Sequence, residues 1–259
     1  MKSNRKTVDD RHFKILSLLK EKGTIRADDI AENCGISLMT VRRDLQYLEE
    51  QGMLKRTHGG ATLPERSSAP VIQTDLTVFC RDCISEYAAQ FINDGDVLFI
   101  NGSRTALNAL KYVGDKHVTV YTNNGWAMHT SFPEHVTIIF TGGELRGKVM
   151  VGEYVMRNLL NITSDITFLG CAAVYEDGEF RYDIPTEIGI NESMITHTRR
   201  SLYILCDHTK LQKQNSRDNL YGSCTYERDL TLITDNMADP DVIESLTQMG
   251  MHIIQVPVK

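Results

Sequence analysis

The stretch IRADDIAENCGISLMTVRRDLQYLEEQGMLKRTHGGATL, residues 25–63, decides the fold of the amino-terminal part of the chain. Its apolar residues recur at helical spacing in two runs, which Gly35 and Gly52 are suited to end. Ser37 is a good N-cap for the second of these helices. The last part, residues 53–63, predicts two short strands around a His-Gly-Gly turn.

One more helix is expected upstream of this stretch. Its apolar face is carried by Ile15, Leu16, Leu18 and Leu19, and Gly23 ends it. Three helices followed by a hairpin within about 60 residues are typical of a winged helix-turn-helix. In such a fold the third helix is the one that can enter the major groove of DNA.

The third predicted helix has two distinct faces. Placing Val41, Leu45 and Leu48 against the other helices turns a polar, basic face with one tyrosine outward. Arginine can bind guanine and glutamine can bind adenine in the major groove, while hydroxyl groups bond phosphates. The candidate DNA-binding residues are Ser37, Met39, Thr40, Arg42, Arg43, Gln46 and Tyr47 at this helix, with Lys55, Arg56 and His58 on the hairpin. The alternative is that the arginine pair belongs to an ordinary solvated helix face.

Charge is divided unevenly along the chain. Residues 1–66 hold 13 Lys and Arg against 10 Asp and Glu, whereas the rest hold 15 against 24, out of 28 and 34 in the whole chain. A small basic part joined to a large acidic one indicates a polyanion-binding head on a body that polyanions repel. Chance clustering of surface charge is the alternative.

A change of composition marks the junction between the two parts. Residues 64–70, PERSSAP, combine two prolines and two serines without apolar periodicity. We therefore expect a winged helix-turn-helix domain over 1–63, a linker over 64–74 and a larger domain over 75–259.

The larger domain alternates apolar, strand-like runs with amphipathic helical ones. The expected strands are 96–101, 117–122, 135–141, 165–170, 201–207, 230–235 and 252–258. The expected helices lie near 80–92, 104–113, 125–131, 149–160, 187–198 and 240–248. This alternation predicts an α/β fold with a mostly parallel sheet covered on both faces, which binds small molecules at the carboxyl ends of its strands.

The quoted stretch also resembles a known family. Its pattern of Gly-Ile-Ser, Thr-x-Arg-Arg-Asp-Leu, Leu-Glu, Gly and Arg-x-His-Gly-Gly-Ala, from Gly35 to Ala61, looks very like the DNA-binding head of the DeoR family of bacterial transcription regulators. The likeness continues over nearly all of residues 75–235. It implies an oligomeric repressor of a carbohydrate catabolic operon, which binds double-stranded operator DNA. It also implies a body that resembles ribose-5-phosphate isomerase and senses a small anion, commonly a phosphorylated sugar.

The residues themselves also predict an anion site. The segment Asn101–Thr105 ends a strand and opens a helix, so backbone N–H groups, the positive helix end and two hydroxyl groups meet there. Glycines and asparagines at other strand ends would let a ligand approach the backbone, with ordinary turns as the alternative. Together with positions implied by the resemblance, the candidate effector-binding residues are Asn101, Gly102, Ser103, Arg104, Thr105, Asn123, Asn124, Gly142, Gly143, Glu144, Gly170, Asp207 and Lys210.

Three departures from the family pattern indicate an unusual effector. The chain reads Asn-Gly-Ser-Arg-Thr at 101–105 where the family usually has Asp-Ser-Gly-Thr-Thr. It has Cys-Ala-Ala-Val at 171–174 in place of a glycine-containing turn, and no lysine in 187–191. Arg104 would either bind a phosphate or fill the site with its own charge.

Two other classes of function fit the sequence less well. One is a sugar-phosphate isomerase-like enzyme fused to a DNA-binding head, which would need four charged residues to converge: Asp207, Lys210, Glu144 and Glu187. The other is a metal or redox switch at the C-x-x-C of Cys80 and Cys83. No second C-x-x-C or nearby histidine pair completes a zinc set, so packing is the favoured interpretation.

Composition excludes several further classes. The first residues lack the uninterrupted apolar run of a signal peptide, and no run is long enough to span a membrane, so we expect a cytoplasmic protein with no membrane partner. Six scattered cysteines predict reduced thiols that are mostly buried. We expect no catalytic residue, no metal and no cofactor, and we expect Trp126 in the core or in a pocket wall.

Overall fold

The computed structural model describes residues 11, 12, 14, 15, 18, 19, 23–50, 54–57, 59–62, 75–213, 221–224 and 229–258. The chain divides into two compact units, residues 1–75 and 76–259. The expected linker over 64–74, the helix end at Gly52 and the candidate residue His58 lie outside the described residues.

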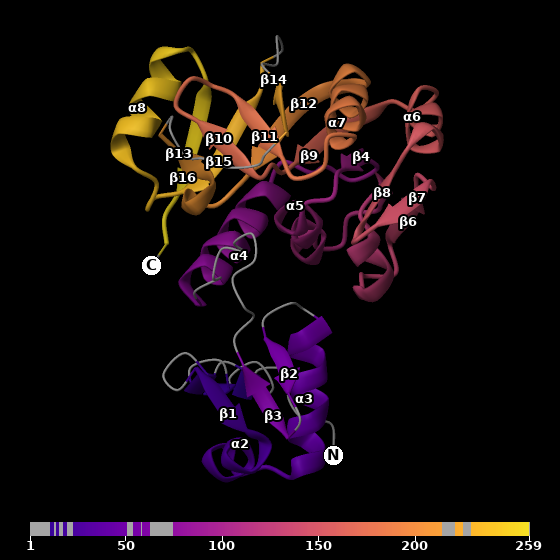
Figure 1. Cartoon of the computed structure of the whole chain (residues 1–259). Helices are drawn as coiled ribbons and strands as arrows, with labels where there is room; N and C mark the ends of the chain where they lie inside the picture. Colours follow the sequence, from indigo (N-terminus) through magenta and orange to yellow (C-terminus); the bar gives the residue numbers. More distant parts are fainter. Residues whose placement is uncertain are drawn as a thin grey trace. The chain divides into compact units, whose positions relative to one another are not determined.

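The first unit is a helix-turn-helix with a small sheet (Figure 1). Helix α2 (Ala27–Cys34) ends at Gly35, whose φ of 64° is left-handed, and α3 (Leu38–Glu50) begins after Ser37. The described residues of the first expected helix are helical, and Ile15 and Leu19 pack with α2 and α3 in one core. This confirms the helical periods predicted from the sequence.

The sheet of this unit has one strand more than the sequence predicted. β2 (Lys55–Thr57) and β3 (Gly60–Thr62) form the expected antiparallel hairpin, and β1 (Thr24–Arg26) pairs with β3 on its other side. Gly60 is required at this pairing, because a Cβ there would lie 2.1 Å from the carbonyl oxygen of Ile25. The sheet therefore joins the wing to the chain that enters α2.

The second unit is built on a seven-stranded sheet whose strand pairs are all parallel. The spatial order is β16-β15-β12-β9-β4-β5-β6. The bounds are β4 (Val97–Ile100), β5 (Val118–Thr122), β6 (Val136–Phe140), β9 (Ser164–Leu169), β12 (Thr198–Leu205), β15 (Thr231–Asp235) and β16 (His252–Val256). All seven strands predicted from apolar runs are present, so the predicted α/β class is confirmed.

Both faces of this sheet are covered, which explains the apolar character of its strands. One face packs on α4 (Asp75–Ala89), α5 (Arg104–Asn108) and the short 3-10 helices η1 (Ala109–Tyr112) and η2 (Gly125–His129). The other face packs on α6 (Glu153–Leu159), α7 (Glu187–Thr196) and α8 (Pro240–Gln248). Figure 1 shows α4 and α5 on the opposite side of the sheet from α7 and α8.

Two parts of the second unit differ from the prediction. The helix expected over 149–160 begins at Glu153, because Val149–Val151 is a strand, β8, paired with β7 (Glu144–Arg146). A four-stranded sheet of short strands was also missed. Its order is β13-β10-β11-β14, with bounds β10 (Ala173–Tyr175), β11 (Phe180–Tyr182), β13 (Leu211–Gln212) and β14 (Tyr221–Cys224). Runs of two to four residues are too short to show a period.

No helix among the described residues is both long enough and apolar enough to cross a membrane. Five cysteines are described as free thiols, and of these only Cys80 and Cys206 are buried. The expectation that the thiols are mostly buried is therefore wrong for the described set, since Cys34, Cys83 and Cys171 are partly exposed.

Candidate functional site

Helix α3 is fixed from within by a buried carboxylate, Asp44. Nε and Nη2 of Arg11 donate to its two oxygens at 2.6 and 2.9 Å, and Nε2 of His12 lies 3.1 Å from Oδ1. Burial alone raises the pKa of Asp44, but the hydrogen bonds from Arg11 and His12 outweigh burial, so the pKa is lowered. The aspartate of the Arg-Arg-Asp-Leu pattern thus holds the helix in place rather than facing outward.

The opposite face of α3 is exposed, as the helical period predicted. Its exposed side chains are Met39, Arg42, Arg43, Gln46 and Tyr47. Met39 is 68% exposed, and Tyr47 is 49% exposed although its ring stacks on His12 at 5.0 Å. These side chains do not pack into the core of the unit, so the surface they form is available to bind a partner.

Two predicted residues at the start of α3 have a local role. Oγ of Ser37 accepts a hydrogen bond from the backbone N–H of Thr40 at 3.2 Å and lies 2.9 Å from the Thr40 hydroxyl. This is the N-cap that the sequence predicted. Both residues remain at least partly exposed, so their hydroxyl groups are still accessible from solvent.

The hairpin is attached to α3 by polar contacts. The backbone N–H of Arg56 donates to Oε1 of Glu49 at 2.8 Å, and the Arg56 guanidinium lies 3.9 Å from Oε2. Lys55 and Arg56 are exposed, and a hollow of about 180 Å³ between α3 and the hairpin has Arg42 and Arg56 among its lining residues. Basic side chains from both elements therefore border one groove.

In the second unit, the predicted effector residues gather where β4, β5 and β9 end. Asn101, directly after β4, is buried and fully bonded. Its amide donates to the Gly170 carbonyl at 2.8 Å and to the Asn191 side-chain oxygen at 3.1 Å, and its own oxygen accepts from the N–H groups of Ser103 and Gly170. Asn101 therefore shapes the loop and has no capacity left for a ligand.

The residues after β5 tie this loop to the β7–β8 hairpin. The Asn124 amide donates to the carbonyl oxygens of Asn101 and Ser103 at 3.1 and 2.9 Å. The Asn123 amide donates to the Met150 carbonyl at 3.1 Å, whereas its Oδ1 is buried with no hydrogen-bond partner. Nδ2 of Asn191 is likewise buried and unpaired. Two unpaired amide atoms, one after β5 and one on α7, are unusual, because buried polar groups are normally paired.

Two cations flank the same aromatic ring beside this loop. The Arg104 guanidinium carbon lies 4.5 Å from the centroid of Trp126, and Nζ of Lys148 lies 4.9 Å from it. Trp126 is partly exposed and packs against the core on the α4 and α5 side of the sheet. Ser103 caps α5 by accepting from the Ala106 N–H, and buried Thr105 follows it. Positive charge is thus concentrated at the mouth of the Asn101–Thr105 loop.

A carboxyl group also lies beside the loop. Oε1 of Glu187, at the start of α7, is 3.0 Å from the position that a Cβ of Gly102 would occupy. Burial, and next the negative charge of Asp183, raise the pKa of Glu187 to about 7. A group with this pKa changes charge near neutral pH.

The glycines that were predicted to let a ligand approach the backbone instead make room for other atoms of the protein. A Cβ at Gly170 would lie 2.3 Å from the Ser103 hydroxyl, and one at Gly143 would lie 2.6 Å from the Val151 carbonyl oxygen. Gly142 and Gly143 also have positive φ, at 70° and 100°. The close approach at Gly143 and Gly170 is therefore between two parts of the protein.

The remaining candidates do not join this group. Glu144 is exposed on the β7–β8 hairpin and pairs with Arg146 at 3.2 Å. Asp207, after β12, pairs at 2.6 Å with Arg81 of α4 and not with Lys210, which lies in η3 (His208–Lys210). Burial raises the pKa of Asp207, but Arg81 and Thr209 outweigh burial and lower it. An isomerase-like site would need Asp207, Glu144 and Glu187 to lie together. The contacts of the described residues do not bring them together.

A further hollow of about 500 Å³ lies at the opposite, amino-terminal edge of the sheet. Its walls include Arg200, Thr231 and Met249. Arg200 is occupied there by a two-point ion pair with Asp96 at 2.9 and 2.5 Å. None of the candidate effector residues lines this hollow.

Comparison with known proteins assigns both units. Residues 11–67 match the family model described as the DeoR-like helix-turn-helix domain, and residues 81–236 match the DeoR C terminal sensor domain. The chain belongs to the DeoR family. It is a DNA-binding transcription regulator with a sensor domain, as the sequence motifs indicated.

Named relatives of this DeoR-family chain include two repressors. It is 31% identical to the lactose phosphotransferase system repressor of Lactococcus lactis subsp. lactis over 91% of this chain and 94% of that one. It is 30% identical to the glycerol-3-phosphate regulon repressor of Escherichia coli strain K12 over 77% and 81%. Among solved structures, the ribose 5-phosphate isomerase A of Methanocaldococcus jannaschii aligns with 54% of this chain and 55% of its own, at 16% identity and a TM-score of 0.38.

Sequence reasoning missed several residues around the Asn101–Thr105 loop in this DeoR-family chain. Lys148 lies beside a strand in a segment that borders an expected helix, so its position next to Trp126 could not be foreseen. Asn191 and Asp183 carry no local pattern that links them to Asn101 or Glu187. The sequence offered one signal of the carboxyl group at this site: Glu187 lies in a helix that often carries a lysine in this family.

Proposed function

We propose that this chain is a repressor of a carbohydrate catabolic operon, and that a small anion such as a phosphorylated sugar controls its hold on operator DNA. The observation that carries the proposal is the exposed polar face of α3, fixed from behind by Asp44, in a chain whose second unit is a sensor domain. The relatives whose names include glycerol-3-phosphate regulon and lactose phosphotransferase system support a sugar-related target.

On the DNA side, α3 enters the major groove and the hairpin follows the backbone. Arg42, Arg43 and Gln46 are the residues that would contact base edges, because their side chains are exposed. Arginine can donate two hydrogen bonds to guanine, and glutamine can form two with adenine. Ser37, Thr40 and Tyr47, with Lys55 and Arg56, would bond phosphates. Footprinting followed by gel shifts with variants of these residues tests the assignment.

One such head makes too few contacts for tight specific binding, so two or more heads act together. We infer an oligomer that places two heads on half-sites about one helical turn, or a multiple of it, apart. Deleting one half-site of the footprinted operator should then weaken binding far more than twofold. Equal affinity for one and two half-sites, with a monomer in sedimentation, would overturn the inference.

On the effector side, the anion binds at the Asn101–Thr105 loop. Arg104 and Lys148 attract it, and the unpaired amide atoms of Asn123 and Asn191 provide polar partners for the rest of a sugar-like molecule. A thermal-shift screen of phosphorylated sugars and polyols identifies the ligand, because a ligand that binds only the native state raises the melting temperature. Operator release by the same compound then connects binding to control.

Arg104→Ala tests the site directly. The variant should lose both the thermal shift and operator release while keeping operator affinity, and Arg146→Ala, an exposed arginine on the β7–β8 hairpin, should behave like wild type. A gain of response to phosphorylated sugars in Arg104→Ala would show instead that the guanidinium substitutes for the ligand charge. A variant with unchanged responses would place the ligand elsewhere.

The same protein should leave sugar phosphates chemically unchanged. Incubating it with pentose and hexose phosphates and analysing the mixture by chromatography checks this. Turnover that depends on Glu187 would favour the isomerase-like alternative, since the pKa of Glu187, the carboxyl group beside the Asn101–Thr105 loop, is raised into the range of a general base.

A further inference from the structure

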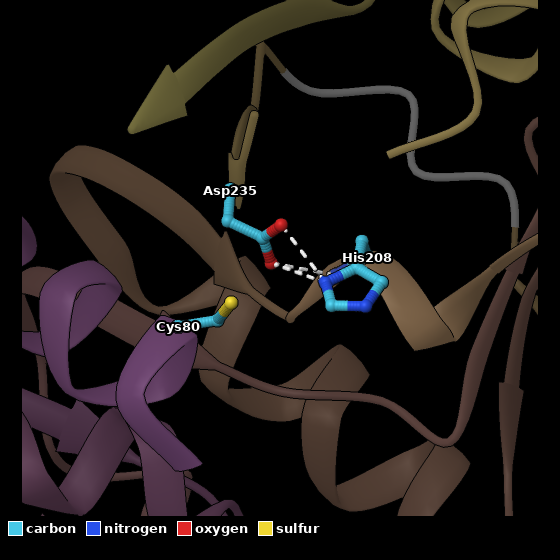
Figure 2. A group of neighbouring side chains, drawn as sticks. All are labelled: Cys80, His208 and Asp235. Atoms are coloured by element: carbon cyan, nitrogen blue, oxygen red, sulfur yellow. Dashed lines mark hydrogen bonds and ion pairs between the residues drawn. The ribbon is translucent and has the colours of Figure 1, made fainter. Parts of the chain in front are cut away.

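Three side chains of different chemistry meet at the other half of the same sheet edge. Cys80 comes from α4, His208 from η3 and Asp235 from the last position of β15. One donor atom from each lies within 4.8 Å of the other two. Figure 2 shows the thiol of Cys80 and the ring of His208 both directed at the Asp235 carboxylate.

This cluster is largely shielded from water but has an opening. Cys80 and the Asp235 side chain are 0% exposed, whereas the His208 side chain is 19% exposed. Nδ1 of His208 lies 2.9 and 3.0 Å from the two oxygens of Asp235. The histidine therefore forms the side from which a small ion could enter.

The carboxylate has bonding capacity left for a further partner. The backbone N–H of Met237 donates to Oδ1 at 3.0 Å, and the backbone N–H of His208 donates to Oδ2 at 2.8 Å. A carboxylate has about four lone-pair sites, so one site on each oxygen faces the His208 ring and the Cys80 thiol. These are the positions where a cation could replace a bridging proton.

We propose that Cys80, His208 and Asp235 form a binding site for a divalent transition metal ion, with Zn²⁺ as the best match. Thiolate, imidazole and carboxylate are the three ligand types that Zn²⁺ takes in proteins, at about 2.0 to 2.3 Å each, and sites with three protein ligands leave a fourth position for water. Mg²⁺ and Ca²⁺ are disfavoured because they prefer oxygen ligands alone. Binding expels the thiol proton and moves the ring proton of His208 from Nδ1, where it bridges to Asp235, to Nε2, so that Nδ1 can hold the metal.

Local sequence patterns do not reveal this site, because its members come from three distant segments. The C-x-x-C pattern pairs Cys80 with Cys83, whereas the structure joins Cys80 to His208 and Asp235 and leaves Cys83 out of the group. Cys83 is partly exposed and packs with the core under α4. It is therefore a matched control, a thiol on the same helix and in the same motif.

A metal at this position would fasten α4 to the ends of β12 and β15. The neighbouring ion pair of Arg81 with Asp207 already spans the same two parts of the fold, with its partners 126 positions apart in the sequence. Such a cross-link stabilises the native state, since a ligand set assembled only on folding adds its binding free energy to folding. The site is distinct from the Asn101–Thr105 loop and does not depend on the proposed effector.

The test is a titration of the full-length, tag-free protein with Zn²⁺ and with Co²⁺. Wild type and Cys83→Ser should bind one Zn²⁺ per chain in calorimetry, show sulfur-to-cobalt charge-transfer absorption with Co²⁺, and melt at a higher temperature with Zn²⁺. Cys80→Ser and His208→Gln should each bind at least about 100-fold more weakly, since even outer-shell changes cost about 10- to 100-fold. Asp235 is left unchanged because it also accepts backbone N–H groups of the fold.

Two results would overturn the proposal. One is a wild-type protein that binds Zn²⁺ no better than Cys80→Ser, in which case the thiol only packs against Sδ of Met237, 4.0 Å away. The other is equal loss of binding in Cys83→Ser, which would move the metal to the C-x-x-C itself. If Cys80→Ser fails to fold, His208→Gln decides the outcome alone, because its side chain is partly exposed.

Discussion

The two units use buried polar residues in opposite ways. In the head, Asp44 is buried and its oxygens are bonded by Arg11 and His12, while the residues proposed to contact DNA are exposed. Around the Asn101–Thr105 loop, all hydrogen-bonding groups of the Asn101 side chain are paired, but Asn123 and Asn191 each keep one buried atom without a partner. A hydrogen-bond network in which every buried polar atom is paired supports a rigid surface. Where buried atoms are unpaired, a ligand that bonds to them gains binding free energy.

The largest expected effect is on the paired network around Asp44. Asp44→Ala leaves Arg11 as a largely buried, unpaired charge, so we expect the head to lose about 3 kcal/mol of stability and operator binding with it. Thermal unfolding followed by circular dichroism measures the loss. Glu32→Ala, which removes an exposed carboxylate on α2 that does not line the hollow beside α3, is the control and should leave both properties unchanged. Similar melting of the two variants would mean that Asp44 is not what fixes α3.

The exposed face of the head should matter for affinity and not for folding. Arg43→Ala should weaken binding to the operator by about 2 kcal/mol, because a bidentate contact with guanine is lost, and should leave binding to random DNA nearly unchanged. Gel shifts on both DNAs at several salt concentrations make the comparison. A uniform loss on both would reassign Arg43 to the phosphate backbone.

Glu187 gives the second unit a pH dependence opposite in sign to the one that Asp44 gives the head. Its raised pKa of about 7 means that the folded state holds a proton which the unfolded state releases near 4.5. The stability of the second unit should therefore fall as pH rises from about 4.5 to about 7. Glu187→Gln should be neutral at pH 5 and stabilising by about 1 to 2 kcal/mol at pH 8, a value reduced for partial solvent access.

Asp183→Asn sharpens this result, because it removes the charge that is the second cause of the raised pKa. The variant should show part of the Glu187→Gln effect at pH 8. Urea unfolding at the two pH values measures both variants. A Glu187→Gln protein that follows the wild-type pH profile would show that the carboxyl group is solvated.

The smallest expected effect belongs to Lys55. An exposed lysine on the hairpin adds one phosphate contact, so Lys55→Ala should change affinity by less than about 1 kcal/mol and lower the salt slope by about one. The loss should be the same for operator and random DNA. A sequence-dependent loss would place the hairpin in a groove.

Periodic and local features of this chain could be predicted from its sequence. The seven strands are continuous apolar runs because both faces of a parallel sheet are buried, and the Ser37 cap and Gly35 helix end follow from local backbone chemistry. Exposure on α3 followed directly from the 3.6-residue period. These features depend on neighbours in the sequence.

The missed features depend on contacts between distant segments. Arg11 and Asp44 are 33 residues apart, and no local sequence pattern at either residue indicates that the two form a pair. Residues 149–151 continue the helical pattern of 153–159 in the sequence, yet they become strand because β7 offers a partner. The glycines at 143 and 170 were correctly placed at strand ends, but only the tertiary structure shows that they admit the chain's own atoms.

The spatial order of the strands also sets the order in which a newly made chain can mature. β4 lies between β5 and β9, and the bond from Asn101 to Gly170 spans 69 residues. The head closes its contacts within a short, early stretch, and contacts local in sequence form faster. On a ribosome, where amino-terminal domains fold first, α3 is in place before β9 exists to close the loop at Asn101. Each molecule therefore folds its DNA-binding surface before it folds its sensor domain.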